Sequence, residues 1–358
     1  MVKLNRRSFL KGAAVGAAAA SVGFPTFLRK AQAAPYVLKF ATYEPLQAFL
    51  PVRVFLPWIN MINEAGQDVL KIEFYGNGVL GPDPTQQLKM VTDGVADITS
   101  GASVGYAPGR FPESTVVNVP FVANNMMEAS IATHRMYEQN AFSGYNDIIA
   151  LTCNAQAQYF LHSLKPIRVP ADMKGVKVRT AGKMQQDLVT AAGGTPVAES
   201  ISKIAENMSR NVMQATVGEW QGMETFRVVD VAKCHTYVPF GTNIFPIVVT
   251  KRAFEKMSTA AQDLLMKFSG LPLVTSYAWE WDDFNEGVEK KTRADPATTH
   301  IDMDEELTTV WTKTLEDAVQ GWLKTDARFP KVYDLYREEV VKAREYLAAN
   351  GPITPMWA

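Results

Sequence analysis

Arg179 is the residue in this sequence with the clearest potential for binding chemistry. It lies in the stretch 174–182, where Val176 and Val178 alternate with polar residues, the period of a short strand with one buried face. A helical pattern follows at 183–192. Arg179 is therefore expected at the carboxyl end of a strand, where open α/β sheets bind small ligands, and its planar guanidinium suits a carboxylate. The alternative is an exposed arginine in an ordinary strand–helix loop.

Cysteine and histidine side chains offer little further chemistry. Cys153 and Cys234 form either one disulfide, if their Cα atoms come within about 7 Å, or two buried free thiols. The four histidines have no metal-ligand spacing and are expected to be ordinary core or surface residues: His134, His162, His235 and His300. We therefore expect no metal, no cofactor and no catalytic residue.

The N-terminal 33 residues have the features of an export signal. Arg6 and Arg7 form a twin-arginine motif, the stretch 12–24 is weakly apolar, and Ala-Gln-Ala at 31–33 matches a cleavage site. We expect cleavage after Ala33 and a mature protein that works in the periplasm. The alternatives are a signal retained as a membrane anchor and a cytoplasmic protein whose arginine pair arises by chance.

The charge balance changes once the signal is set aside. The chain of 358 residues has 36 Lys and Arg against 37 Asp and Glu, and the signal holds six of the basic residues and no acidic one. The remainder has 30 basic and 37 acidic residues, a net charge of −7. A nucleic-acid partner would need a basic face, so this class is disfavoured. A small anionic ligand needs only local positive charge and is compatible with the acidic balance.

Strands that alternate with helices indicate the fold class. A helix is expected at 55–66, with a kink at Pro57, and the chain beyond Phe254 is predicted to be mostly helical. Strands are predicted at 37–41, 70–74, 96–100, 148–153, 158–161, 176–179, 196–198, 212–217, 234–238 and 246–250. This order predicts an α/β fold rich in parallel strands.

Two domains are expected without a linker between them, so the chain must cross between them more than once. Such an arrangement places a ligand in an interdomain cleft that closes about a hinge. The expected parts are the signal at 1–33, a first part of domain I at 34–154, the main part of domain II at 155–238, a return to domain I at 239–270, and a helical segment at 271–358 that packs on both domains.

Several short segments, taken in order, give the mature chain a resemblance to a known family. They are 38–41 (LKFA), 74–81 (FYGNGVLG), 86–97 (QQLKMVTDGVAD), 118–122 (NVPFV), 165–167 (KPI), 172–179 (DMKGVKVR) and 246–254 (PIVVTKRAF). In order and spacing they resemble the DctP-like solute-binding proteins of tripartite ATP-independent periplasmic (TRAP) transporters. The resemblance implies a two-domain periplasmic-binding-protein fold with a long helix spanning both domains. It also implies delivery of a small organic acid to a membrane permease driven by an ion gradient.

The resemblance assigns a role to Arg179, but this chain lacks a second arginine that many members of the family have. In that family the arginine after Lys-Gly-x-Lys-x pairs with the ligand carboxylate, and here this residue is Arg179. Many members carry a second arginine shortly before Lys-Pro-Ile, whereas this chain has Gln158 and Tyr159 there. We therefore expect a monocarboxylate, or a ligand whose other end is polar but neutral. Trp220 matches a tryptophan of some members and is expected either to stack on the ligand or to pack in the core or hinge.

Other side chains are candidates for the wall of the cleft. Glu44, after the first strand, could accept a hydrogen bond from a ligand hydroxyl or amine but would repel a carboxylate; a solvated loop glutamate is the alternative. Five more residues are expected to line the cleft, with packing or solvent exposure as the alternative for each: Ser103, Tyr106, Phe121, Asn243 and Phe245. Together with Trp220, the aromatic residues favour an aromatic or otherwise bulky carboxylate.

Three functions are compatible with these features. The first is solute capture, in which a monomer closes on a small organic acid and docks on TRAP permease subunits. The second is an exported enzyme that acts on a small carboxylate, since many redox enzymes use twin-arginine export, but the chain has no Cys/His cluster. The third is a sensor module that uses the same cleft to signal to a membrane partner. We predict capture without chemistry.

Overall fold

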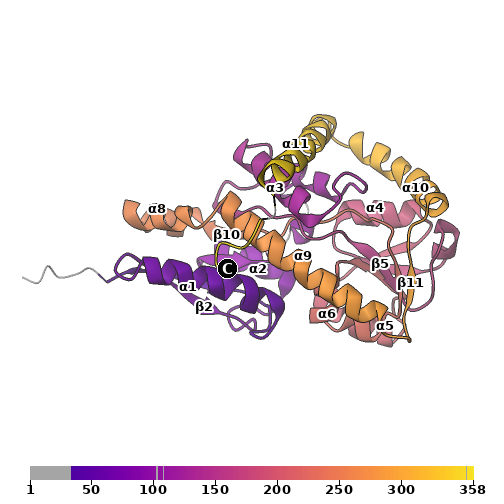
Figure 1. Cartoon of the computed structure of the whole chain (residues 1–358), viewed down its shortest axis with the longest axis horizontal. Coiled ribbons are helices and arrows are strands. Elements are labelled where there is room, and N and C mark those ends of the chain that lie inside the picture. Colours follow the sequence, from indigo (N-terminus) through magenta and orange to yellow (C-terminus); the bar gives the residue numbers. More distant parts are fainter. Residues whose placement is uncertain (1–33, 102–103, 108, 352) are drawn as a thin grey trace, which may run out of the picture. The chain divides into compact units, whose positions relative to one another are not determined.

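Two β-sheets, each covered by helices, make up the fold (Figure 1). The computed structural model describes residues 34–101, 104–107, 109–351 and 353–358. Pro35–Ala358 forms one compact unit. We call each sheet with its covering helices a lobe. The predicted α/β fold with two such lobes is confirmed.

The first lobe is built on a five-stranded sheet in the order β2-β1-β3-β10-β4. Its strands are β1 (Tyr36–Ala41), β2 (Leu70–Tyr75), β3 (Ile98–Ser100), β4 (Ile148–Thr152) and β10 (Ile247–Thr250). Its helices are α1 (Leu56–Ala65), α2 (Gln87–Thr92), α3 (Met126–Glu138), α7 (Lys251–Lys256) and α8 (Thr259–Lys267). Along β1, Leu38 and Phe40 are buried while Lys39 is exposed, the alternation expected of a strand with one covered face.

The irregularity expected at Pro57 is present in an altered form. A π-helical turn at Pro51–Phe55 precedes α1 directly, and Pro57 is the second residue of α1. Proline is tolerated there because the first backbone N–H groups of an α-helix have no intrahelical acceptor. The change of helix type therefore takes the place of a kink inside one helix.

The second lobe is built on a six-stranded sheet in the order β11-β9-β5-β8-β6-β7. Its strands are β5 (Phe160–Ser163), β6 (Lys177–Thr180), β7 (Thr195–Ala198), β8 (Ala215–Gly218), β9 (Cys234–Thr236) and β11 (Thr299–Ile301). Its helices are α4 (Lys183–Ala191), α5 (Ile204–Ser209), α6 (Trp220–Thr225) and α10 (Glu305–Leu323).

Both sheets are mixed: most of their strand pairs are parallel, as expected, but each sheet also contains one strand that runs antiparallel to its neighbours. β5 runs antiparallel to β8 and β9, and β10 runs antiparallel to β3 and β4. Each of these strands directly follows a crossing of the chain from one sheet to the other, from β4 to β5 and from β9 to β10. A strand that enters a sheet from the other lobe need not share the direction that local strand–helix–strand units impose.

The long helix α9 (Leu271–Arg293) contacts both lobes, as predicted (Figure 1). On the first lobe, Phe284 stacks on Phe49 with ring centroids 4.5 Å apart. On the second, the indole of Trp281 donates a hydrogen bond to Glu219 over 3.2 Å, and Asn285 accepts one from the backbone of Gln221 over 2.6 Å. The last helix, α11 (Phe329–Asn350), packs against α3. Among the described residues, no helix is both long and apolar enough to cross a membrane.

The two cysteines are free thiols in the structure. Cys153 follows β4 in the first sheet, whereas Cys234 begins β9 in the second. Cys153 is fully buried beside the hydroxyl of Tyr145, 3.6 Å from its sulfur, and burial raises the pKa of its thiol to about 12. Of the two alternatives left open by the sequence, the structure has the free thiols.

We expect a reducing agent to leave the thermal midpoint of the purified protein unchanged, because there is no cross-link to remove. A thiol reagent should label two groups per chain after unfolding and almost none before it, since both sulfurs are buried. A mass 2 Da lower than that of the reduced chain, or a midpoint that falls with reductant, would contradict the free thiols.

Candidate ligand-binding cleft

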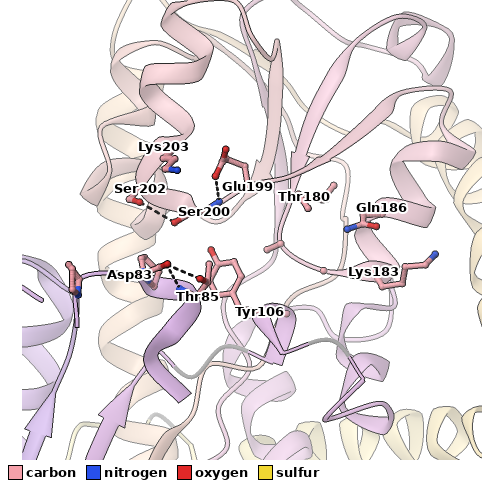
Figure 2. Close-up of a pocket in the computed structure, with 16 residues that line it drawn as sticks. Asp83, Thr85, Tyr106, Thr180, Lys183, Gln186, Glu199, Ser200, Ser202 and Lys203 are labelled. Carbon is pink, nitrogen blue, oxygen red and sulfur yellow. Dashed lines mark hydrogen bonds between the residues drawn. The ribbon is translucent and has the colours of Figure 1, made fainter. Parts of the chain in front are cut away.

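A cavity of about 740 Å³ lies between loops of the two lobes (Figure 2). From the first lobe it is lined by Pro82, Asp83, Pro84, Thr85, Gly105 and Tyr106. From the second lobe it is lined by Thr180, Ala181, Gly182, Lys183, Gln186, Ala198, Glu199, Ser200, Ser202 and Lys203. The second-lobe residues begin at the carboxyl ends of β6 and β7, which are neighbours in the sheet. The cavity therefore occupies the position where α/β sheets bind ligands.

Arg179 lies directly behind this cavity. It is 2% exposed, which excludes the alternative of an exposed loop arginine. Its Nε donates to the carbonyl oxygen of Glu199 over 2.9 Å, and one terminal nitrogen donates to the hydroxyl of Tyr106 over 2.8 Å. Because both partners line the cavity, the guanidinium is held by protein contacts next to the space a ligand would fill. A buried arginine in a fixed orientation is suited to binding a carboxylate.

Contacts among the described residues join the two lobes across the cleft. The hydroxyl of Tyr106, from the first lobe, also accepts a hydrogen bond from the backbone of Ile201 over 3.3 Å. The ring of Tyr43 stacks on Phe226 of the second lobe with centroids 6.2 Å apart. Gly105 approaches the second lobe so closely that a Cβ there would overlap the carbonyl oxygen of Ala181. These loops therefore form the inner surface of a closed cleft.

Two glutamates belong to the same region, and both are nearly fully buried. Glu44 and Glu219 are 2% and 3% exposed, so Glu44 is not a solvated loop residue. Burial raises the pKa of Glu44 to about 8, with the charge of Glu219 adding to the effect, and burial raises the pKa of Glu219 to about 7. Burial and the charge of Glu219 raise the pKa of the nearby Tyr159, and the charge of Arg179 lowers it. The region thus combines the guanidinium of Arg179 with two buried carboxyl groups, and the cavity wall adds four more charged residues: Asp83, Lys183, Glu199 and Lys203.

Three other predicted residues lie close to this cluster. Tyr159 is buried and its hydroxyl donates to Gln156 over 2.6 Å. Phe245 packs edge-on against Trp281 with centroids 5.7 Å apart, and its ring lies next to Gly101. The amide of Asn243 lies beside Gly105, and its oxygen accepts from the backbone of Ile244 over 3.0 Å. Tyr159 thus lies near Arg179, Asn243 lies beside Gly105 of the cavity wall, and Phe245 lies beside Trp281, the partner of Glu219. Their contact with a ligand remains a prediction.

Two predicted residues lie away from the cavity. The amide of Gln158 donates to the carbonyl of Gly241 and borders a small void next to Tyr336. Phe121 has a positive φ of 64° and lines a different cavity, formed with residues of α10 and α11. Gln158 was placed from the resemblance and Phe121 from its loop position, and in the structure the side chains of both are directed elsewhere.

Ser103 lies outside the described residues, so its predicted place on the cleft wall is not described. It is the central residue of the stretch 101–105 (GASVG), which has the Gly-x-Ser-x-Gly spacing of a hydrolase nucleophile elbow. Such an elbow joins a strand to a full helix. Here β3 is followed by a 3₁₀ turn of three residues, Val104–Tyr106, so the context of that motif is not met.

Trp220 lies among histidines on the second sheet. It is 2% exposed, and its ring centroid is 4.8 Å from those of His162 and His235 and 6.3 Å from that of His300. His162 contacts the carbonyl of Gly218 through Nε2 over 3.1 Å, so we infer that this nitrogen carries the proton and that Nδ1 of His235 donates to Nδ1 of His162 over 2.8 Å. Among the described residues, no group of three His, Cys, Asp or Glu side chains could hold a metal ion.

The histidine cluster should make the protein sensitive to acid. Burial lowers the pKa of His162 to about 4 and that of His235 to about 2, whereas both protonate near pH 6.5 in the unfolded chain. Their neutral state supports folding above pH 6.5, and this stability is lost as the pH falls toward 4.

We expect His162→Gln to flatten the fall of the unfolding free energy between pH 6.5 and 4 by about 1.4 kcal/mol per pH unit. Denaturant unfolding at each pH measures this slope, with pH 8 as the reference at which neither histidine titrates. Equal slopes for the variant and the unchanged chain would contradict a neutral buried His162.

Several cavity residues were not predicted from the sequence. Glu199, Ser200 and Ser202 follow β7, and a rule that assigns ligand contacts to every strand end would have found them. Glu219 directly follows β8, so the same rule points to it, although its two oxygens cap α6 by accepting from the backbone of Gln221 and Gly222.

The export signal, the two lobes spanned by one helix and the cavity beside a buried arginine define an exported two-lobed ligand-binding protein. Residues 3–23 match the twin-arginine translocation signal sequence, so the protein is exported by this route to the periplasm. Residues 52–325 match the bacterial extracellular solute-binding proteins, family 7. The chain belongs to this family, which is the DctP family of the predicted resemblance.

Solved structures share the fold over nearly their whole length. A TRAP solute-binding protein from an unidentified marine microbe, specific for aromatic acid ligands and bound to 3-hydroxybenzoate, is 24% identical with a TM-score of 0.82, over 87% of this chain and 99% of that one. A TRAP solute-binding protein from Rhodoferax ferrireducens with copurified benzoate is 18% identical with a TM-score of 0.80, over 87% of this chain and 99% of that one. A TRAP solute-binding protein from Bordetella bronchiseptica with bound mandelate is 21% identical with a TM-score of 0.77, over 86% of this chain and 99% of that one.

A curated solute-binding protein of Albidiferax ferrireducens is 23% identical over 216 residues, which are 57% of this chain. The match spans 62% of the length of that relative.

Proposed function

We propose that the mature chain is the solute-binding subunit of a TRAP transporter and that it captures an aromatic monocarboxylate for an ion-gradient-driven permease. The observation that carries this proposal is the buried guanidinium of Arg179, held by Tyr106 and Glu199 at the back of the interlobe cavity. In this proposal the ligand carboxylate pairs with Arg179, and the lobes close over the rest of the molecule. Ligand shifts the balance toward the closed form through contacts that only this form offers.

The aromatic character of the ligand is supported by the side chains around the cleft. The rings of Tyr43 and Phe226 stack across it, Tyr106 lines the cavity, and Tyr159 and Phe245 are buried nearby. Flat rings of this kind contact an aromatic ligand over a large area. The structurally similar proteins bound to 3-hydroxybenzoate, benzoate and mandelate point to the same class of ligand.

A single carboxylate is supported by the charges in the cleft. Arg179 is accompanied by two buried carboxyl groups, Glu44 and Glu219. A second carboxylate on the ligand would be buried beside these two groups, where burial already raises the pKa of a carboxyl group and disfavours its ionised form. The amide of Gln158, near the place of the family's second arginine, is turned toward Gly241.

A thermal-shift screen of the mature protein tests this function. The set comprises aromatic, aliphatic and keto monocarboxylates together with aliphatic dicarboxylates, and calorimetry follows for each compound that raises the midpoint. We expect the strongest stabilisation from aromatic monocarboxylates, because binding to the folded form alone raises its stability. Stabilisation by dicarboxylates alone would overturn the proposal.

A further inference from the structure

Glu44 has a buried carboxyl oxygen that has no hydrogen-bond partner among the described residues. This oxygen is Oε2, and the side chain is 2% exposed. Glu44 follows β1 in a loop whose preceding residue, Tyr43, stacks on the second lobe. A buried acceptor without a donor costs folding free energy, so such atoms are rare unless something outside the chain fills the place.

Glu219 shows by contrast how a buried carboxyl group is normally satisfied. Its oxygens accept from the backbone of Gly222 over 2.8 Å, from the backbone of Gln221 over 2.6 Å and from the indole of Trp281 over 3.2 Å. Glu219 is thus a fixed structural cap at the start of α6. Glu44 is the carboxyl group of the pair that is free to receive a donor.

The groups that face Glu44 belong to the same cleft as Arg179. Tyr43 donates a hydrogen bond to the Glu44 side chain, and the charge of Glu219 acts on it. Burial and the charges of Glu44 and Glu219 help to raise the pKa of Tyr277 on α9. Burial and the charge of Glu219 raise the pKa of Tyr159, and the charge of Arg179 lowers it. Glu44, Glu219, Tyr159 and Arg179 therefore form a series of interacting buried groups, with a guanidinium at one end and the unsatisfied oxygen of Glu44 at the other.

We propose that the ligand carries a hydrogen-bond donor on the end opposite its carboxylate and that Glu44 accepts this hydrogen bond. The inference rests on the proposed function, because it takes the carboxylate at Arg179 as given. A hydroxyl group on the ring and an ammonium group on a short side chain offer the same chemistry to Glu44. An ether or a second carboxylate in that place offers no donor and leaves Oε2 without one, whereas a donor bound at Oε2 favours the ionised form of Glu44.

Calorimetry with matched ring compounds tests the donor. Benzoate, 3- and 4-hydroxybenzoate, the corresponding methoxybenzoates and 3- and 4-(aminomethyl)benzoate are titrated into the mature protein at pH 7. We expect at least one donor-bearing compound to bind more than about tenfold tighter than its methoxy partner, because a site built to accept a hydrogen bond rejects the analogue that lacks it. If the hydroxybenzoates bind tighter than the (aminomethyl)benzoates, the donor is a hydroxyl group; the reverse order indicates an ammonium group.

The Glu44→Met variant assigns the preference to this side chain. Methionine fills similar volume without an acceptor oxygen, so we expect the ratio between donor and methoxy compounds to fall to about twofold or less. Benzoate should bind at least as well as before, since it gains nothing from Glu44. Glu64→Met, at an exposed glutamate on α1, is the control and should keep the preference. Glu44→Gln keeps a carbonyl acceptor, and it should retain part of the preference if the methionine variant fails to fold.

The outcomes separate this inference from the proposed function. Aromatic monocarboxylates that bind equally well with and without a donor would overturn the role of Glu44 while leaving the proposed function intact. A donor preference that survives in Glu44→Met would do the same. Failure of every ring compound to bind would overturn the proposed aromatic ligand, and this inference with it.

Discussion

Replacing Arg179 by methionine is expected to weaken the binding of an aromatic monocarboxylate by about 2–5 kcal/mol, the range for removal of one partner from a buried charge pair. This corresponds to a loss of affinity from roughly 30-fold to several-thousand-fold. The reason is geometric as well as electrostatic: Tyr106 and Glu199 hold the guanidinium beside the cavity, so the cost of orienting it is already met in the free protein. Calorimetry with benzoate or a hydroxybenzoate measures the change.

Lys177→Met supplies the matched control for Arg179→Met. Lys177 lies on the same strand, β6, but its side chain is exposed. Its replacement removes one positive charge from the same lobe without touching the cleft, so we expect affinity to change by less than about 1 kcal/mol, as for an exposed charge. Arg179→Lys should recover only part of the loss, because an ammonium group lacks the planar fork. Nearly unchanged affinity in Arg179→Met would remove this residue from the site.

Gly105→Ala is expected to weaken ligand binding by about 1–3 kcal/mol, the range for an added methyl group in a packed contact. The new Cβ would overlap the backbone carbonyl of Ala181, which cannot move as a flexible side chain can. The loops of the two lobes must then separate, and the closed form loses stability relative to the open one. Because the ligand gains its contacts in the closed form, apparent affinity falls with the population of that form.

Small-angle scattering with and without ligand, together with calorimetry, measures the effect of Gly105→Ala. The variant should need more ligand to reach the compact form, while the thermal midpoint of the free protein changes little. Gly287→Ala is the control, because this glycine lies within α9 and a Cβ there has no neighbour within 4 Å. Unchanged affinity in Gly105→Ala would show that the contact between Gly105 and Ala181 is not needed for ligand binding.

The prediction for Arg179 came from features that are local in the chain. The alternation of Val176 and Val178 and the helix start after Gly182 identify a strand end from neighbouring residues alone. The structure has β6 and α4 within one residue of the expected bounds at that point. Periodicity of this kind depends on which face of an element is buried, and residues close in sequence report it.

The cleft wall opposite Arg179 was predicted less well. Loop residues lack the regular alternation of buried and exposed positions from which the direction of a side chain can be inferred. Tyr106 was expected in the cleft and is there, 73 residues from the arginine that it contacts. Phe121 was expected in the cleft by the same reasoning and lines another cavity. Glu219 was not expected at all, since its neighbourhood with Glu44 depends on how the two lobes meet.

The sequence by itself determined the export signal, the order of strands and helices, the family and the arginine at the strand end. Each of these features depends on residues that are adjacent or regularly spaced in the chain. The tertiary structure alone decided that Cys153 and Cys234 stay apart, that Trp220 packs among histidines, and that Glu44 has an unsatisfied oxygen in the cleft of Arg179. These facts depend on contacts between segments distant in the chain, where packing and hydrogen bonding across the lobes, rather than local preference, set the direction of each side chain.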